Sequence, residues 1–134
     1  MLVGKALRGI GGALVGRLGE RRAAGFLRRR GLRIVARNVR CGHGELDIVA
    51  MDGETIVFVE VKSSTERSRR PGIERLDAAK RRNLRRVSRR FLSGLRARGI
   101  VCAAWRFDAV CVDFRVRGGF PRVVEIRWYP GIEV

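Results

Sequence analysis

The hydrophobic positions along the chain follow two different periods, and these periods predict helices and strands in a definite order. Apolar residues recur at steps of three and four over residues 15–30 and 73–98, which is typical of helices with one buried face. Two-residue alternation and short apolar runs predict strands at residues 32–40, 45–51, 55–62, 102–116 and 122–129. The chain is therefore predicted to be an α/β protein, with a mixed sheet of about five strands flanked by helices.

The length and the N-terminal composition set the expected domain organisation. With 134 residues the chain is long enough for one core, and residues 15–134 are expected to form a single domain. Five glycines between residues 4 and 16 weaken any helix there, so residues 1–14 are expected to be a loosely ordered lead-in. Arg8 interrupts the apolar run of this segment, which disfavours a targeting peptide.

The charge points to the partner of the protein rather than to its fold. Thirty lysines and arginines face thirteen aspartates and glutamates, a formal net charge of +17 at pH 7. Nucleic acid is the expected polyanion, and the charge leaves DNA and RNA open. An anionic membrane is the alternative, but the arginine-rich helix lacks large aromatic residues opposite its basic face, so no membrane partner is expected. The three cysteines lack CxxC spacing, which favours a reducing cytoplasm over a disulfide framework.

The predicted hairpin places charged residues where a buried strand is normally apolar. If Asp52-Gly53 is a two-residue turn, Asp47 lies diagonal to Glu60 on the same face, with β-carbons about 7 Å apart. Lys62 follows Glu60 by two residues and therefore points to the same side. The sequence thus predicts that three ionisable side chains converge, provided that this turn sets the register.

This cluster suits the hydrolysis of a phosphodiester bond. Two carboxylates at that separation can share Mg²⁺, or Mn²⁺ in its place, because both cations prefer oxygen ligands. The cation lowers the pKa of a bound water and neutralises charge on the scissile phosphate. Lys62 can orient that water or stabilise the transition state. Each residue taken singly has a structural alternative, such as an exposed Glu60–Lys62 pattern, but together Asp47, Glu60 and Lys62 favour catalysis.

Both predicted helices carry a charged residue on an apolar stripe. Glu20 is aligned with Ala23 and Leu27, and Lys80 is aligned with Leu84. A carboxylate directed at a sheet needs a cation or a metal as its partner, so Glu20 is a fourth catalytic candidate. An ion pair with an arginine of its own helix is the structural alternative.

Basic residues cluster along the second predicted helix and in the loop before it. The candidates for contact with nucleic acid are Arg67, Arg69, Arg70, Lys80, Arg81, Arg82, Arg85 and Arg89. Each phosphate contact would add to the salt dependence of binding without reading sequence. Trp105 and Trp128 could stack on bases, but their alternation with charges is more typical of half-buried strand positions.

Several short motifs resemble a known family. They are Leu18-Gly19-Glu20, Gly44-Glu45-Leu46-Asp47, Phe58-Val59-Glu60-Val61-Lys62, Lys80 and Arg106-Phe107-Asp108. With these motifs, roughly residues 16 to 114 are similar to the YraN-like family of small bacterial proteins. That family is assigned to the restriction-endonuclease-like PD-(D/E)xK superfamily, near the archaeal Holliday-junction resolvases. The resemblance implies a mixed sheet flanked by helices, metal ligation by Asp47 and Glu60 with help from Glu20 and the Val61 carbonyl, and Lys62 as the catalytic lysine.

The expected function is that of a metal-dependent endonuclease that hydrolyses phosphodiester bonds of DNA, with branched or structured DNA as the expected substrate. A basic nucleic-acid-binding protein without catalysis, whose acidic cluster is structural or degenerate, is the alternative. A resolvase-like role would favour a homodimer, although the sequence leaves the oligomeric state open.

Overall fold

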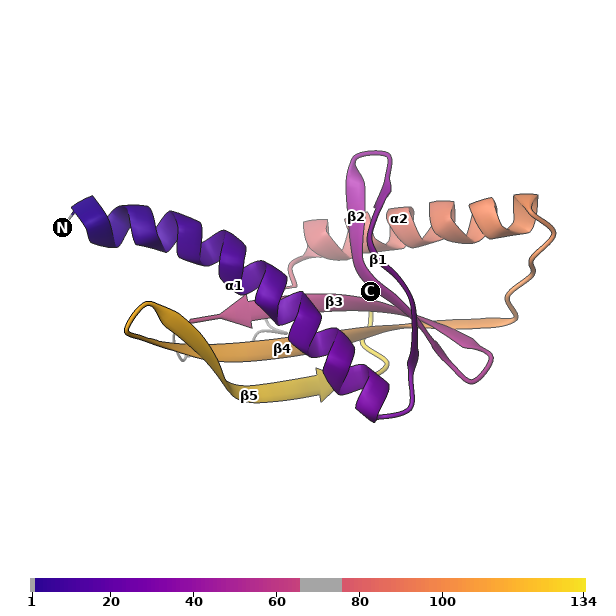
Figure 1. The fold of residues 1–134 in the computed structure, drawn as a ribbon. Helices are drawn as coiled ribbons and strands as arrows, with labels where there is room; N and C mark the ends of the chain where they lie inside the picture. The colour runs from indigo at the N-terminus through magenta and orange to yellow at the C-terminus, as the bar shows by residue number, and fades with distance from the viewer. Residues whose placement is uncertain (1, 66–75) are drawn as a thin grey trace.

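The computed structural model describes residues 2–65 and 76–134, which form a five-stranded mixed sheet with two helices (Figure 1). The elements are α1 (Leu2–Arg29), β1 (Arg33–Cys41), β2 (Gly44–Asp52), β3 (Thr55–Ser64), α2 (Ala78–Ala97), β4 (Ala104–Arg117) and β5 (Phe120–Tyr129). The predicted fold class is confirmed, because the segments with helical and strand periods form helices and strands in the predicted order.

The strands lie side by side in the order β1-β2-β3-β4-β5. All neighbours are antiparallel except β3 and β4, which are parallel. A parallel pair needs a crossover connection, and the segment that contains α2 provides it. β3 therefore occupies the centre of the sheet, where its residues 56–60 are buried.

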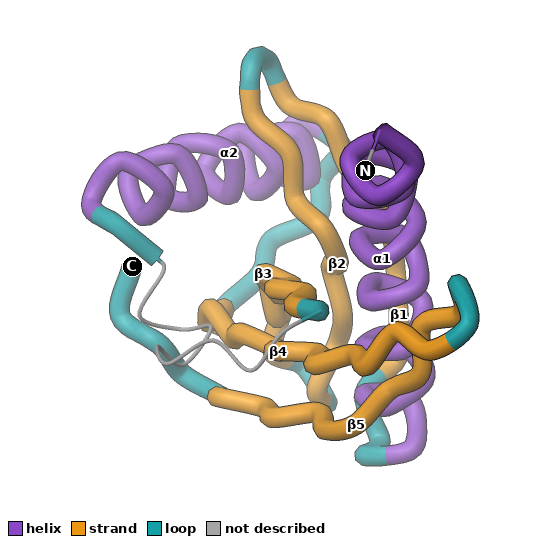
Figure 2. The backbone as a smooth tube through the Cα atoms, turned by 90° about the vertical axis from the view of Figure 1, so that its left-hand side faces the viewer, coloured by secondary structure: helices purple, strands orange, loops and turns teal. Residues whose placement is uncertain are grey.

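Two apolar clusters hold the helices on opposite faces of the sheet (Figure 2). Leu27 of α1 packs in one cluster with Val57 of β3, and Val87 of α2 packs in the other with Phe58 of β3. Successive side chains of a strand point to opposite faces, so β3 contributes to both cores. A charged residue in the middle of β3 must therefore face one of the two helices.

The first helix is longer than predicted. α1 begins at Leu2 rather than at residue 15, so the helical backbone runs through the glycine-rich segment that was expected to weaken it. Glycine lowers helix propensity, but extending a helix that has already formed is easier than starting one. The division of the chain into a lead-in at residues 1–14 and a domain at 15–134 stays a prediction. In the part of the chain that the structure describes, neither helix has the length and apolar character needed to cross a membrane.

The second helix begins at Ala78, where a side chain caps it. Asp77 has an extended backbone, and its Oδ1 accepts a hydrogen bond of 2.8 Å from the Lys80 N–H. Such a cap satisfies a donor that the first helical turn leaves without a partner. The predicted start at residue 73 falls outside the described residues, and the helix starts later than its apolar spacing suggested.

The turn of the central hairpin differs by one residue from the prediction. Asp52 pairs with Thr55, so the two-residue loop is Gly53-Glu54. Gly53 has a φ of 60°, which fits the first position of a tight hairpin loop and which glycine adopts without strain. The preference of this position for glycine therefore decides the loop, and the predicted Asp52-Gly53 turn was wrong.

With the observed turn, Asp47 and Glu60 lie opposite each other on the two strands of the hairpin. β2 and β3 remain paired as far as Ile48 and Val59. Continued by one step, this register sets Asp47 opposite Glu60 rather than diagonal to it. The shared face of the two residues was nevertheless predicted correctly, because the change moves each partner by two residues and side chains alternate with a period of two.

Candidate functional site

The central hairpin divides at the position of the charged residues. β2 leaves β3 beyond Ile48 and Val59 and continues with β1 alone. Asp47 is the first residue of β2 beyond this fork, and its Oδ2 accepts a hydrogen bond of 2.9 Å from the Val61 N–H. The carboxylate thus satisfies a strand donor that β2 no longer reaches, and the bond holds Asp47 against β3.

Glu60 is buried beside this fork, with 4% of its side chain exposed. Its Oε1 lies 3.0 Å from Lys80 Nζ and 3.5 Å from Lys62 Nζ. Its Oε2 is buried and has no hydrogen-bond donor among the described residues. A buried acceptor without a donor is unfavourable, so this oxygen favours an additional cation or hydrogen-bond donor.

The carboxyl of Asp47 resists ionisation in this setting. Burial and the neighbouring Glu60 carboxylate raise its pKa from 3.8 to about 8, Glu20 adds to the rise, and the hydrogen bond from Val61 opposes it. For Lys80, burial opposes the charge, but Glu60 outweighs this effect and holds the pKa above the ordinary value of 10.5. The carboxyl of Asp47 therefore tends to stay protonated, although two ammonium groups lie beside the neighbouring Glu60.

Glu20 approaches the same centre from α1. In the amide orientation that satisfies both of its polar atoms, Asn38 donates to Glu20 Oε2 at 2.7 Å and to Glu45 Oε1 at 3.2 Å. Burial and the Glu45 carboxylate raise the pKa of Glu20. Asn38 has a φ of 51°, a left-handed conformation that asparagine tolerates better than most residues. A strained backbone that supports an acidic cluster is typical of a functional site.

A close contact sets the depth at which α1 lies on the sheet. A β-carbon added at Gly19 would overlap the Ser63 side chain of β3, so glycine allows the helix to approach. Beside this contact is a groove of about 370 Å³, lined by Leu14, Arg17, Leu18, Glu20, Arg21, Arg37 and Asn38. Its arginines make the approach to Glu20 attractive to an anion.

The structure brings most of the predicted catalytic residues together. Asp47, Glu60 and Lys62 meet at the fork, and Glu20 lies at the edge of the same group. Lys80, predicted as a contact for nucleic acid and recognised as a charge on an apolar helix stripe, pairs with Glu60.

Sequence reasoning missed two further polar residues of the site. Glu45 precedes Asp47 by two residues, which was a signal that it belongs to the same group. For Asn38 the only signal was an asparagine inside a strand pattern, because a left-handed φ cannot be read from one sequence.

The donors at the fork fit a hard divalent cation. Among the described residues, no three His, Cys, Asp or Glu side chains lie close enough to hold a metal ion by themselves. Mg²⁺ needs only one or two protein carboxylates, because it keeps several waters. Asp47 and Glu60 offer two such carboxylates, and the buried Glu60 Oε2 has no competing donor among the described residues. A direct role for Glu20 as a ligand stays a prediction.

The predicted nucleic-acid contacts divide into three groups. Arg67, Arg69 and Arg70 lie outside the described residues. On α2, Arg82 and Arg89 are exposed and Arg85 is half-buried. Arg81 donates from Nε to the Leu76 carbonyl at 3.1 Å, so part of its hydrogen-bonding capacity supports the start of the helix.

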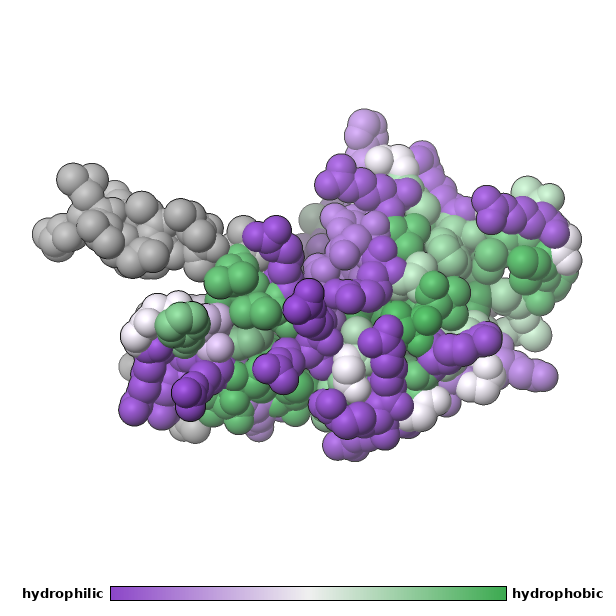
Figure 3. Space-filling view, viewed as in Figure 1, coloured by the Kyte–Doolittle hydropathy of each residue, from purple (hydrophilic) through white to green (hydrophobic). Residues whose placement is uncertain are grey.

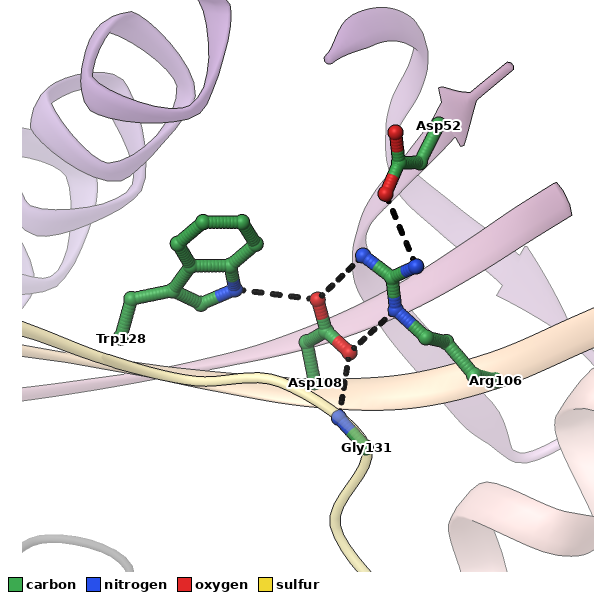
Figure 4. A network of polar contacts seen from close by, with 5 residues as sticks. All are labelled: Asp52, Arg106, Asp108, Trp128 and Gly131. Carbon is green, nitrogen blue, oxygen red and sulfur yellow. Dashed lines mark hydrogen bonds and ion pairs between the residues drawn. The ribbon is translucent and has the colours of Figure 1, made fainter. Parts of the chain in front are cut away.

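A second buried carboxylate lies on the neighbouring strand, in a closed polar network (Figure 4). Asp108 is fully buried. Arg106 donates to it from Nε at 3.0 Å and from Nη2 at 3.3 Å, and also reaches Asp52 with Nη1 at 2.9 Å. Trp128 Nε1 and the Gly131 N–H donate to its two oxygens at 3.0 and 2.9 Å. Asp108 therefore ties β4 to the end of β5 and the hairpin turn, and has a structural role.

The fold and the fork define a small α/β protein with a partly satisfied acidic centre in a mixed sheet. The family model described as "Uncharacterised protein family UPF0102" matches residues 19–112, which contain Glu20, Asp47, Glu60 and Lys80. The chain belongs to this family. The predicted YraN-like membership is thereby confirmed.

Relatives from several bacteria carry the printed name "UPF0102 protein". The chain is 48% identical to one from Symbiobacterium thermophilum over 101 residues, which cover 74% of this chain and 81% of that protein. It is 43% identical to one from Beutenbergia cavernae over 116 residues, which cover 84% of this chain and 92% of the other. It is also 43% identical to one from Oleidesulfovibrio alaskensis over 112 residues, which cover 84% of this chain but 54% of that protein. The match thus spans about half the length of the last relative.

Proposed function

We propose that this protein is a metal-dependent endonuclease with its active centre at the fork between β2 and β3. The observation that carries the proposal is the pair of adjoining carboxyls, Asp47 and Glu60. The pKa of Asp47 is raised to about 8, and one oxygen of Glu60 is buried without a donor among the described residues. A buried carboxylate pair with an oxygen that accepts no hydrogen bond favours a further cation, and a divalent cation would fill that role.

The donor set determines how such a cation would be held. Asp47 and Glu60 are the two carboxylate ligands, and the Val61 carbonyl, between Glu60 and Lys62 in the chain, is the third donor that the motif assigns. When bound, Mg²⁺ or Mn²⁺ would neutralise charge on the scissile phosphate and lower the pKa of the attacking water.

The lysines of the site have separate tasks. Lys62, within 3.5 Å of Glu60, stabilises the negative charge that grows on the phosphate. Lys80, whose Nζ lies 3.0 Å from Glu60 Oε1, holds the Glu60 side chain in place. Cleavage then proceeds by direct attack of water, without a covalent intermediate on the protein.

The resemblance to the PD-(D/E)xK superfamily supports the same function. The motif carboxylate Asp47 and the Glu60-Val61-Lys62 segment lie on adjacent strands, with Asp47 bound to the backbone between Glu60 and Lys62. An arrangement that depends on two strands explains why residues separated by a turn act as one site.

DNA is the proposed substrate: charge favours a nucleic acid, and the resemblance to the resolvase-like superfamily favours DNA. The formal net charge of +17 and the arginine-lined groove beside Glu20 both favour a polyanion. A structured or branched DNA would suit a protein that carries basic residues both at this groove and on α2. The rival function is that of a nucleic-acid-binding module with an inactive acidic cluster, and the closed network around Asp108 shows that this fold does use buried carboxylates structurally.

The decisive measurement is cleavage of labelled linear, flapped and four-way-junction DNA, with Mg²⁺ or Mn²⁺ against EDTA. Wild type is expected to cut only with the metal, and D47N and E60Q are expected to lose cutting by at least about a hundredfold. K62A is expected to lose less, because it removes charge stabilisation but leaves the metal ligands.

The matched control is Glu54→Gln, which neutralises an exposed carboxylate in the hairpin turn. It should cut like wild type. Equal DNA binding by all variants, with no cutting of any substrate by folded protein, would make the binding module the correct function.

A further inference from the structure

An exposed aromatic pocket lies at the other end of the sheet from the acidic fork. Its volume is about 300 Å³, and its main lining residues are Arg89, Leu92, Arg96, Ile100, Val101 and Trp105. Trp105 pairs with Ile56 near the start of β3, whereas Glu60 pairs with Ala109 further along. The pocket is therefore separate from the proposed metal centre.

The apolar part of this pocket is open to solvent. Trp105 is 51% exposed and Val101 75% exposed. Figure 3 shows hydrophobic surface at this end, where the chain passes from α2 to β4. Trp128 differs, because its ring nitrogen is bound to Asp108. A half-exposed tryptophan beside other exposed apolar side chains marks an interaction site, and its ring offers a flat face for stacking.

The charged part of the pocket restricts the ligand to an anion. Arg89, Leu92 and Arg96 lie at steps of three and four and share one face of α2. The same stripe continues back through Arg85 to Arg82. From Arg82 to Arg96 it is about 21 Å long at 1.5 Å per residue, and it begins within one turn of Lys80. Among the described residues, no acidic side chain lines the pocket.

A flat ring and phosphates together describe a nucleotide. Stacking on an aromatic face accepts any base, because every base has a π-face, and arginines beside it bind the backbone. Bases in a duplex are already stacked on their neighbours, so only an unpaired base can enter. A small molecule with one ring and a phosphate would fill the pocket but would not contact the arginines of the stripe that lie beyond it.

We propose that this pocket binds an unpaired nucleobase of a single-stranded segment, which stacks on Trp105 while Arg89 and Arg96 bind the flanking phosphates. The strand then follows the arginine stripe of α2 towards the acidic fork. This inference rests on the proposed function for its substrate class, and it specifies that the substrate carries a single-stranded portion about the length of α2 away from the cutting site.

The test uses tryptophan fluorescence of the full chain in EDTA, so that cutting does not interfere. A short oligo-dT strand and a duplex with an oligo-dT overhang are expected to quench the fluorescence, and a blunt duplex is expected to do so much less. In W105F the remaining tryptophan, Trp128, should not respond. W105A should bind the overhang roughly 5- to 100-fold more weakly, the cost of losing one stacked base.

Charge variants and a matched control complete the test. R89Q and R96Q should each reduce the slope of log affinity against log salt by about 0.7, the value for one phosphate contact of a single strand. Phe120→Ala removes another exposed aromatic ring, 74% exposed in the hairpin between β4 and β5, and should bind like wild type.

Failure of this inference and failure of the nuclease proposal give different results. If wild type cuts DNA but W105A binds the overhang as tightly as wild type, the pocket has no role in binding and the inference is overturned, while the nuclease remains. If oligo-dT quenches Trp105 but nothing is cut, the pocket stands and the nuclease does not. Quenching by phosphatidylglycerol vesicles but not by oligo-dT would overturn the inference and assign the pocket to a lipid surface.

Discussion

Two buried carboxylates on neighbouring strands have opposite surroundings. Asp108 on β4 is fully buried, and both of its oxygens accept hydrogen bonds, from Arg106, Trp128 and Gly131. Glu60 on β3 is almost as deeply buried, yet one of its oxygens has no donor within the described residues. Burial is therefore not what distinguishes the two residues.

The difference lies in what each carboxylate can still bind. A buried charge that is fully paired holds elements together, and nothing further can reach it. A buried charge that is only partly paired keeps a capacity for a cation, at a cost to stability. We therefore expect variants of Asp108 to unfold the protein and variants of the Asp47–Glu60 pair to change what it binds.

The largest effect is expected for Asp108→Asn, which removes the charge of the closed network and leaves Arg106 without its main partner. The free energy of unfolding should fall by about 3 kcal/mol or more, measured by urea denaturation. The control is Asp113→Asn, which breaks the more exposed pair with Arg127 at 2.9 Å and should cost about 1 kcal/mol or less. Equal losses for the two variants would contradict the structural role of Asp108.

A smaller effect is expected from divalent cations on the other carboxylate pair. Mn²⁺ at about a hundredfold excess over its dissociation constant should stabilise wild type by about 2.7 kcal/mol, seen as a rise in the thermal unfolding midpoint. E60Q should show no such rise, whereas E54Q should respond like wild type. A rise of the same size in E60Q would place the bound cation elsewhere.

The smallest effect is expected for Asp47→Asn in EDTA, and it should depend on pH. Below about pH 4 the carboxyl is protonated in both the folded and the unfolded chain, so its raised pKa has no cost. Between pH 4 and about 8 only the unfolded chain releases the proton, so wild type loses stability as pH rises, and above 8 the loss is complete.

The asparagine variant should therefore match wild type near pH 4. Its advantage should grow steadily as the pH rises through 7 and level off above pH 8, measured by denaturation across this range. A variant that is less stable than wild type at pH 7 would show that the Asp47 carboxylate is already compensated.

Most of the fold could be predicted from the local periodicity of the apolar residues. Strand alternation predicted that Asp47 and Glu60 share a face, and this survived an error in the turn because the error moved partners by two residues. The turn was predicted wrongly because Asp-Gly is a favoured pair for a two-residue hairpin loop, whereas here Gly53 occupies the first position of the loop. The start of α2 was predicted too early, because the apolar residues keep their helical spacing before Asp77 although the helix begins only after this N-cap.

The rest of the site depends on contacts between elements that no local pattern contains. Lys80 lies 20 residues beyond Glu60 in the sequence, and only the crossover that carries α2 back over β2 sets the two side chains 3.0 Å apart. The bridge that Asn38 makes between two acids requires a left-handed backbone inside a strand. The pocket at Trp105 forms only where the end of α2 meets β4.

The contact between Gly19 and Ser63 has a further consequence. Gly19 has no β-carbon, which leaves room for the Ser63 side chain. The position of Glu20 therefore depends on the small size of its neighbour Gly19 rather than on a bond that Gly19 makes. A single added methyl group at residue 19 would act as a spacer that lifts α1 from β3 or displaces Ser63. A substitution at residue 19, which has no charged or reactive side chain, can thus change how far Glu20 extends towards the fork.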